Sequence, residues 1–108
     1  MPRYLIQAAY TAEGIRGLAE DSASGRRADV QAAVEAVGGK VEAFYYAFGP
    51  DDVIIILDLP NNVTAAAIAL TTSGSGAVRV QTTPLLTVEE VDKALEVKTR
   101  YRAPGAGA

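Results

Sequence analysis

The chain has 108 residues, a length that accommodates one domain with one hydrophobic core. Hydrophobic residues make up 49% and charged residues 21%, which is typical of a globular protein and not of a disordered one. The net charge of −3 argues against nucleic acid as a partner. No apolar run approaches the roughly 20 residues that cross a bilayer, so we expect no membrane partner.

In chain order, the predicted elements are a strand over 3–10, helices over 12–20 and 26–37, strands over 40–48 and 53–59, a helix over 63–73, a strand over 77–83 and a last helix that begins near Val88. Residues 22–25 are expected to break the first helical stretch in two. Thr87 and Glu90 have the spacing of a capping box, which predicts where the last helix begins.

This order predicts a ferredoxin-like α+β fold, βαββαβ, with a four-stranded antiparallel sheet, a split first helix and an extra C-terminal helix. We expect residues 1–97 to form a single domain. Residues 98–108 are predicted to be a basic arm and a disordered tail, because Lys98, Arg100 and Arg102 are followed by Ala, Pro and Gly alone. The arm is expected to contact the acidic body of a partner subunit.

Alternation along the strands divides the sheet into two faces. The set expected under the helices is nearly free of charge: Tyr4, Ile6, Ala8, Tyr10, Val41, Ala43, Tyr45, Ala47, Val53, Ile55, Leu57, Val78, Val80 and Thr82. The opposite face has large apolar side chains among its charges: Leu5, Phe44, Tyr46, Phe48, Ile54 and Ile56. Such a patch is larger than monomers usually expose, so we expect a homodimer whose sheets face each other, with higher assembly from dimers as a further option.

Several stretches resemble the GYD-domain family of small bacterial proteins: Met1-Pro-Arg-Tyr-Leu-Ile-Gln-Ala, Tyr10-Thr-Ala-Glu-Gly-Ile-Arg-Gly-Leu, Gly25-Arg26-Arg27, Gly38-Gly39-Lys40, Glu42-Ala-Phe-Tyr-Tyr-Ala-Phe-Gly49, and Gly76-Ala-Val-Arg79 through Thr87. The likeness covers residues 1–102. At the position of the family's Gly-x-Tyr-Asp motif this chain has Gly49-Pro50-Asp51-Asp52, which keeps the aspartate and replaces the tyrosine. The resemblance implies a dimeric α+β barrel and no established reaction.

The absent residue types narrow the chemistry. The chain has no Cys and no His, which excludes thiolate nucleophiles, Cys-type zinc sites and the commonest general base. Catalysis must then use carboxylates, Lys, Arg, Tyr, hydroxyls or backbone groups, and we expect neither a metal nor a resident cofactor. Asp51 and Asp52 are adjacent, but turn chemistry explains them better than a cation does. No signal peptide is visible, so we expect a cytoplasmic protein.

Three groups of residues are candidates for ligand binding. Gln7, Arg79 and Gln81 lie on the mixed face, where a guanidinium between two amides suits a carboxylate or phosphate. The alternative is that Arg79 pairs with Asp58 or Glu42 across the dimer interface.

Tyr4, Tyr10 and Tyr45 share the helix-facing set with Thr82. Their hydroxyls can line a pocket between the sheet and the helices, where relatives of this barrel often hold flat organic substrates. The alternative is ordinary core packing. Arg26 and Arg27 open the second helix, where two cations and free backbone N–H groups suit an anion; the alternative is a capped helix start with solvated arginines.

These residues favour a homo-oligomeric protein that binds a small organic or anionic ligand. An enzymatic version is a cofactor-independent isomerase, lyase or oxygenase-like activity, in which Tyr45 or Tyr46 transfers a proton and Arg79 stabilises an enolate. The alternative is a non-catalytic regulatory or structural module that acts through oligomerisation or a protein partner.

Overall fold

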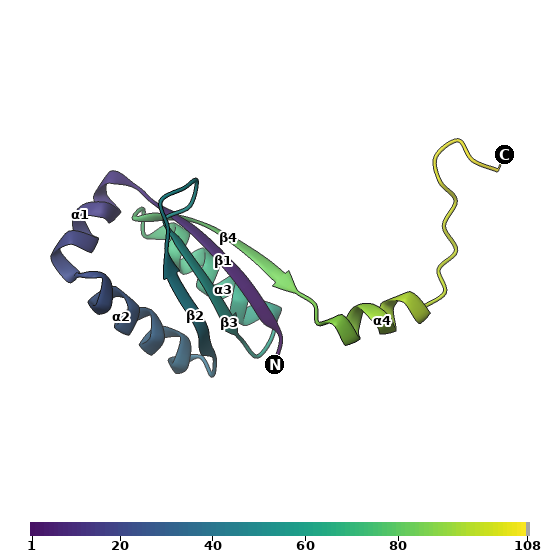
Figure 1. Cartoon of the computed structure of the whole chain (residues 1–108), viewed down its shortest axis with the longest axis horizontal. Coiled ribbons are helices and arrows are strands. Elements are labelled where there is room, and N and C mark those ends of the chain that lie inside the picture. The colour runs from purple at the N-terminus through teal and green to yellow at the C-terminus, as the bar shows by residue number, and fades with distance from the viewer. Residues whose placement is uncertain (108) are drawn as a thin grey trace.

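The computed structural model describes residues 1–107 and contains the expected order of strands and helices. The elements are β1 (Arg3–Tyr10), α1 (Ala12–Asp21), α2 (Ala23–Ala36), β2 (Lys40–Tyr46), β3 (Val53–Asp58), α3 (Asn62–Gly74), β4 (Val78–Leu85) and α4 (Val88–Glu96). The strands form one antiparallel sheet in the order β2-β3-β1-β4, as Figure 1 shows. The predicted ferredoxin-like α+β arrangement is confirmed.

One residue, Ser22, separates α1 from α2, whereas the sequence predicted a longer break over 22–25. Ser22 has φ 71°, a backbone conformation that non-glycine residues rarely adopt. Its N–H donates to the carbonyl of Leu18 at 2.9 Å, which ends α1. Its Oγ accepts from the N–H of Gly25 at 3.1 Å, which caps α2. The same serine therefore ends one helix and begins the next.

The hydrophobic core lies between one face of the sheet and helices α2 and α3. Its buried members are Tyr4, Ile6, Ala8, Val34, Val53, Ile55, Leu57, Leu59 and Ala65. The strand residues among them alternate along β1 and β3, as a sheet with one covered face requires. The predicted inward face of these two strands is confirmed.

On β2 the predicted faces are wrong from residue 43 onward. Val41 pairs with Leu57 and Ala43 pairs with Ile56, so Glu42 is an extra residue in a β-bulge. One inserted residue reverses the alternation that follows it. The bulge turns Phe44 and Tyr46 toward the helices and leaves Ala43 and Tyr45 on the open face.

The open face keeps an apolar centre after this correction. Leu5, Ile54 and Ile56 are half-buried on it, next to the Tyr45 side chain, which is 69% exposed. Phe48, which the sequence also placed here, lies beyond the end of β2 and is fully exposed in the turn before β3.

The C-terminal part of the chain leaves the sheet at the end of β4. Figure 1 shows α4 and the residues after it standing away from the body. The predicted arm and tail over 98–108 extend one residue past the described part of the chain, since Ala108 lies outside it. Within residues 1–107, no helix has the length and apolar character that crossing a membrane requires.

Candidate functional site

An apolar cavity of about 190 Å³ lies between α2, α3 and the covered face of the sheet. Its walls include Val30 and Val34 from α2, Ile68 from α3, and Ile6 and Ile55 from the sheet, with Phe44 also lining it because of the bulge. Helix α2 packs against β2 and α3 packs against β4, so the cavity lies between the two helices, over the middle of the sheet. We call this cavity the inner chamber.

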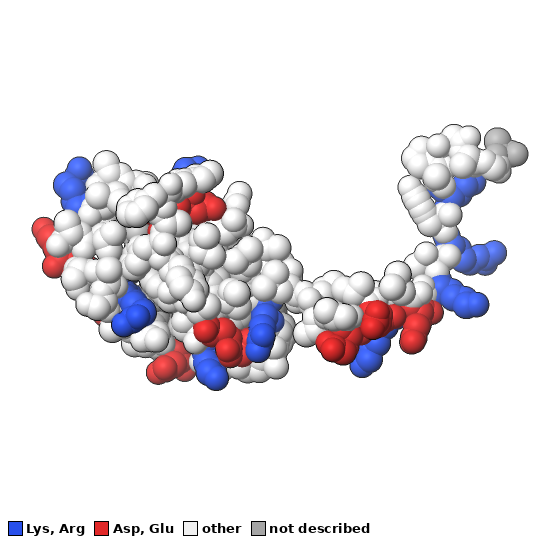
Figure 2. Space-filling model, viewed as in Figure 1, with Lys and Arg blue, Asp and Glu red and all other residues white. Residues whose placement is uncertain are grey.

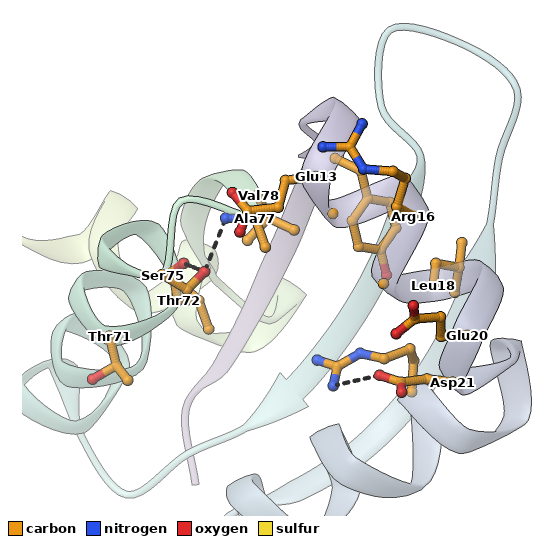
Figure 3. Close-up of a pocket in the computed structure, with 14 residues that line it drawn as sticks. Glu13, Arg16, Leu18, Glu20, Asp21, Thr71, Thr72, Ser75, Ala77 and Val78 are labelled. Carbon is orange, nitrogen blue, oxygen red and sulfur yellow. Dashed lines mark hydrogen bonds and ion pairs between the residues drawn. The ribbon is translucent and has the colours of Figure 1, made fainter.

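A second cavity of about 670 Å³ adjoins the inner chamber and is more polar. Figure 3 shows it between α1, the beginning of α2 and the end of α3. Helix α1 contributes Glu13, Arg16 and Glu20, and β1 contributes Tyr10. We call this cavity the outer cleft.

Arg26 lines both cavities, together with Thr72 and Val78, and therefore marks where they meet. Its guanidinium lies 3.3 Å from the carboxylate of Asp29 and 3.7 Å from that of Asp21. All three side chains are more than a third exposed, so these ion pairs contribute little to stability and can exchange with another anion. The predicted anion candidate Arg26 thus lies at the mouth of an apolar chamber, whereas Arg27 is exposed and faces away, beside Tyr46.

The hydroxyl of Tyr10 remains protonated to a higher pH than a free tyrosine. Burial raises its pKa above the ordinary value of 10.0, and the neighbouring Tyr46 raises it further. Arg26 opposes both effects by stabilising the phenolate. Tyr46 itself donates a hydrogen bond to the carbonyl of Ala23 at 3.1 Å. At neutral pH Tyr10 is therefore a hydrogen-bond donor to the outer cleft.

An alkaline titration should reveal this environment. Because folding raises the pKa of Tyr10, its contribution to stability is complete below pH 10.0 and is lost as the pH rises through the folded-state pKa. Ultraviolet absorbance should include a component from Tyr10 that ionises above the ordinary range of tyrosine. Tyr10→Phe should remove that late component, and Arg26→Gln should move it to higher pH. A late component that survives in Tyr10→Phe would contradict the assignment.

The structure places the predicted trio of Gln7, Arg79 and Gln81 on the open face. Gln7 lies directly opposite Gln81 in the β1–β4 register, and Arg79 lies opposite Ala9. The amide of Gln7 already donates to Asp51 at 3.1 Å. The sheet separates this trio from Tyr10 and the two cavities. The trio and the helix-facing Tyr10 therefore cannot contribute to one site in the same chain.

Arg79 is exposed and has no ion-pair partner within residues 1–107. Its predicted partners already have neighbours in the same chain: Asp58 lies 3.0 Å from Arg3, and Glu42 lies 3.6 Å from Lys40. Hydrogen bonding to Glu42 lowers the pKa of Asp58, and Arg3 lowers it further against an opposing effect of burial. Pairing of Arg79 across an interface stays a prediction.

The three tyrosines that were expected in one pocket lie in three places. Tyr4 is 1% exposed and donates to Asn62 at 2.5 Å, so it belongs to the core. Tyr10 borders the outer cleft. Tyr45 is on the open face because of the bulge, so it does not line a pocket between the sheet and the helices.

Thr82 faces the helices as predicted but lies outside the lining of both cavities. Its Oγ1 is buried and has no hydrogen-bond partner within the described chain. Because a buried unpaired hydroxyl costs about 1–3 kcal/mol, Thr82→Val should raise the free energy of unfolding by about 1 kcal/mol. Urea denaturation measures this change, and a loss of stability would indicate that Thr82 has a partner in solution.

The hairpin between β2 and β3 carries the two adjacent aspartates, and the structure gives each its own contact. Asp51 accepts from Gln7, and Asp52 accepts from the backbone N–H of Tyr10 at 2.8 Å. The N–H of Asp52 in turn donates to the carbonyl of Ala8 at 2.8 Å. The aspartate that this chain keeps at the motif position therefore fastens the hairpin to the end of β1. Within residues 1–107, no three acidic side chains gather as metal ligands would.

Removal of the Asp52 carboxylate should destabilise the fold. Asp52→Ala leaves the half-buried N–H of Tyr10 without its acceptor, which should lower the free energy of unfolding by about 1–3 kcal/mol. Asp51→Ala is the matched control, because it removes only a side-chain contact to Gln7 and should cost less than about 1 kcal/mol. Equal losses in the two variants, measured by urea denaturation, would refute the structural role of Asp52.

Arg16 is the residue of the outer cleft that the sequence analysis missed. It lies on α1, lines the cleft, and has no ion pair within residues 1–107. A signal did exist: Glu13, Arg16 and Glu20 recur at helical spacing and form one polar face of α1. That face covers a cavity and not open solvent only because α1 lies beside the end of α3.

Comparison with protein families assigns the chain to one of them. The family model described as GYD domain matches residues 4–95 of the chain. No curated protein and no solved structure matches the chain. The matched region includes all four strands, α1 to α3 and most of α4. The chain belongs to the GYD-domain family.

Proposed function

We propose that the protein binds a small organic acid in the inner chamber and the adjoining outer cleft. The observation that carries this proposal is the position of Arg26, at the mouth of a chamber whose walls are almost entirely apolar. A cavity of about 150 Å³ is enough for a single aromatic ring. The chamber, at about 190 Å³, therefore suits a ligand with one ring or a short branched chain.

The ligand's apolar body would fill the chamber and its carboxylate would face Arg26. A guanidinium binds a carboxylate through two parallel hydrogen bonds, which also fixes the ligand's orientation. The ligand would take the place of Asp21 and Asp29, whose contacts with Arg26 are exposed and weak. Tyr10 can donate a hydrogen bond to the same anion, and Arg16 offsets part of the negative charge of Glu13 and Glu20 in the cleft.

Binding fits these residues better than proton-transfer catalysis does. Efficient general acids and bases have a pKa near the working pH, and that of Tyr10 is raised from an already high value. Of the three catalytic candidates from the sequence, Tyr45 and Arg79 lie on the opposite face of the sheet, and Tyr46 donates its hydroxyl to the carbonyl of Ala23. In this proposal the protein is a cofactor-independent binder, and an isomerase, lyase or oxygenase-like activity is the less favoured alternative.

Calorimetry and thermal shift with benzoate and benzamide test the proposal, because the two probes share a ring and differ in charge. Benzoate should bind and benzamide should not. At a hundredfold excess over its dissociation constant, benzoate should stabilise the fold by about 2.7 kcal/mol. Isobutyrate and its amide extend the comparison to a short branched chain.

Two arginine variants locate the site. Arg26→Gln should weaken benzoate binding at least tenfold, whereas Arg79→Gln, on the open face, should leave it unchanged. The opposite pattern would place the acid site on the open face. The absence of binding by every carboxylate in both series would favour the non-catalytic module that acts through oligomerisation or a protein partner.

The second part of the proposal is that the protein works as a homodimer whose open sheet faces pack together. The apolar centre formed by Leu5, Ile54 and Ile56 supports this, because side chains of this size on a strand face are normally covered. Cytoplasmic location, higher assembly and binding by residues of the open face remain part of the same proposal, and none of them is needed for the acid site.

A further inference from the structure

Helix α4 has no core of its own. It spans nine residues, and none of them is buried. Val88, Val91 and Leu95 lie at helical spacing on one side and are 75%, 42% and 79% exposed. Leu86 and Val97, just outside the helix, are also exposed. The helix therefore presents an apolar stripe to solvent.

A helix of this length does not persist without packing. Isolated helices shorter than about 12–15 residues are marginal in water, because nucleation costs more than a few hydrogen bonds return. The capping box of Thr87 and Glu90 contributes about 1 kcal/mol, which does not replace tertiary contacts. Something outside the described contacts must cover the stripe for α4 to be stable.

We propose that α4 packs its apolar stripe, Val88, Val91 and Leu95, against a second copy of this chain. The inference uses the second copy that the proposed dimer supplies and does not depend on the acid site. Exchange of an identical terminal element between protomers is a common and inexpensive way to build a dimer.

The route of the chain favours a second copy. Strand β4 is an edge strand, and its last residue, Leu85, shares the open face with Arg3. Only Leu86 and Thr87 separate this strand from α4, and Thr87 has an extended backbone that carries the helix outward. The stripe therefore begins at Val88, just past the end of this edge strand, and α4 extends away from the sheet, as Figure 1 shows, where a second copy can cover it.

Charge also favours a second copy over an unrelated partner. Residues 1–87 have nine acidic and six basic residues, whereas three basic residues and no acidic residue follow Val97, at Lys98, Arg100 and Arg102. Figure 2 shows these cations beyond α4, separate from the body. A basic arm after the helix complements the acidic body of another copy, and the attraction is mutual in a symmetric dimer.

Paired double variants of the full chain test this interaction. Val91→Ala with Leu95→Ala removes most of the apolar stripe without reducing helix propensity, since alanine is the best helix former. Glu89→Ala with Lys93→Ala is the control, because both side chains lie across the helix from the stripe and the pair of substitutions preserves net charge. Sedimentation over a concentration series should show the dimer dissociation constant rising at least a hundredfold in the first variant and less than threefold in the control.

Amide hydrogen exchange in α4 identifies which chain covers it. The α4 amides of the unsubstituted chain should be protected above the dimer dissociation constant and exchange freely below it. Protection that does not depend on concentration would overturn the proposal by showing that α4 folds onto its own chain. A monomer at all concentrations, or equal dissociation constants for the two double variants, would overturn it as well. Benzoate binding, which depends on Arg26, is measured on the same samples, so failure of one proposal is distinguishable from failure of the other.

Discussion

Gly14→Ala should lower the free energy of unfolding by about 1–3 kcal/mol, whereas Gly17→Ala, one turn along the same helix, should raise it by about 0.5–1 kcal/mol. A Cβ at position 14 would collide with the backbone oxygen of Ala77 and lie 2.9 Å from the ring of Tyr10. Movement of that oxygen is costly, because it accepts hydrogen bonds from the N–H of Thr11 at 2.9 Å and from the Thr11 hydroxyl at 3.2 Å.

Gly17 provides the control for helix propensity. A Cβ at position 17 meets no atom within 4 Å, so alanine there gains the ordinary advantage over glycine in a helix interior. Urea denaturation of the two variants measures both effects under the same conditions. Similar stability in the two variants would mean that α1 does not approach the beginning of β4 as closely as the structure shows. The outer cleft, which lies between these elements, would then have a different shape.

The fold was predictable because its local signals agree with one another. The strands have alternating apolar residues, Thr11 and Thr87 cap their helices as expected, and the order of elements allows one compact topology. Ser22 was harder to assign, because a serine with positive φ has no distinctive sequence pattern.

The candidate site was only partly predictable, and the bulge at Glu42 explains much of the difference. Residues 43–46 are all apolar or aromatic, so alternation does not locate the extra residue that turns Phe44 into the chamber and Tyr45 out of it. Arg26 was recognised as an anion candidate from its place at a helix start. The chamber beside it depends on the spacing between α2 and α3, which is a property of tertiary packing and not of either helix alone.

Because of the bulge in β2, two substitutions have different expected effects, although the sequence alone predicts the same effect for both. Phe44 and Ile56 were both assigned to the open face, where a charge should separate the dimer. Ile56 does lie there, between Leu5 and Ala43 in the register. Phe44 instead packs against the core and lines the inner chamber.

Ile56→Asp should therefore convert the proposed dimer into a folded monomer. In a symmetric interface the substitution buries a carboxylate from each copy without a partner, which should weaken the dimer at least a thousandfold, or about 4 kcal/mol. Phe44→Asp should instead unfold the chain or lower its free energy of unfolding by about 3 kcal/mol or more, because it puts a charge into an apolar chamber. Ala32→Asp, on the exposed side of α2, is the control and should leave both mass and stability unchanged.

Light scattering and circular dichroism on the same samples separate these outcomes. The unsubstituted chain and Ala32→Asp should have twice the monomer mass of 11.3 kDa at micromolar concentration, and Ile56→Asp should have the monomer mass with an unchanged helical spectrum. An unsubstituted chain that is monomeric at this concentration would refute the sheet-to-sheet dimer. A folded, monomeric Phe44→Asp would instead indicate that Phe44 lies on the open face and that β2 has no bulge at Glu42. The two residues lie on neighbouring strands, and the one extra residue in β2 places Phe44 in the inner chamber, whereas Ile56 stays on the open face where the proposed dimer would form.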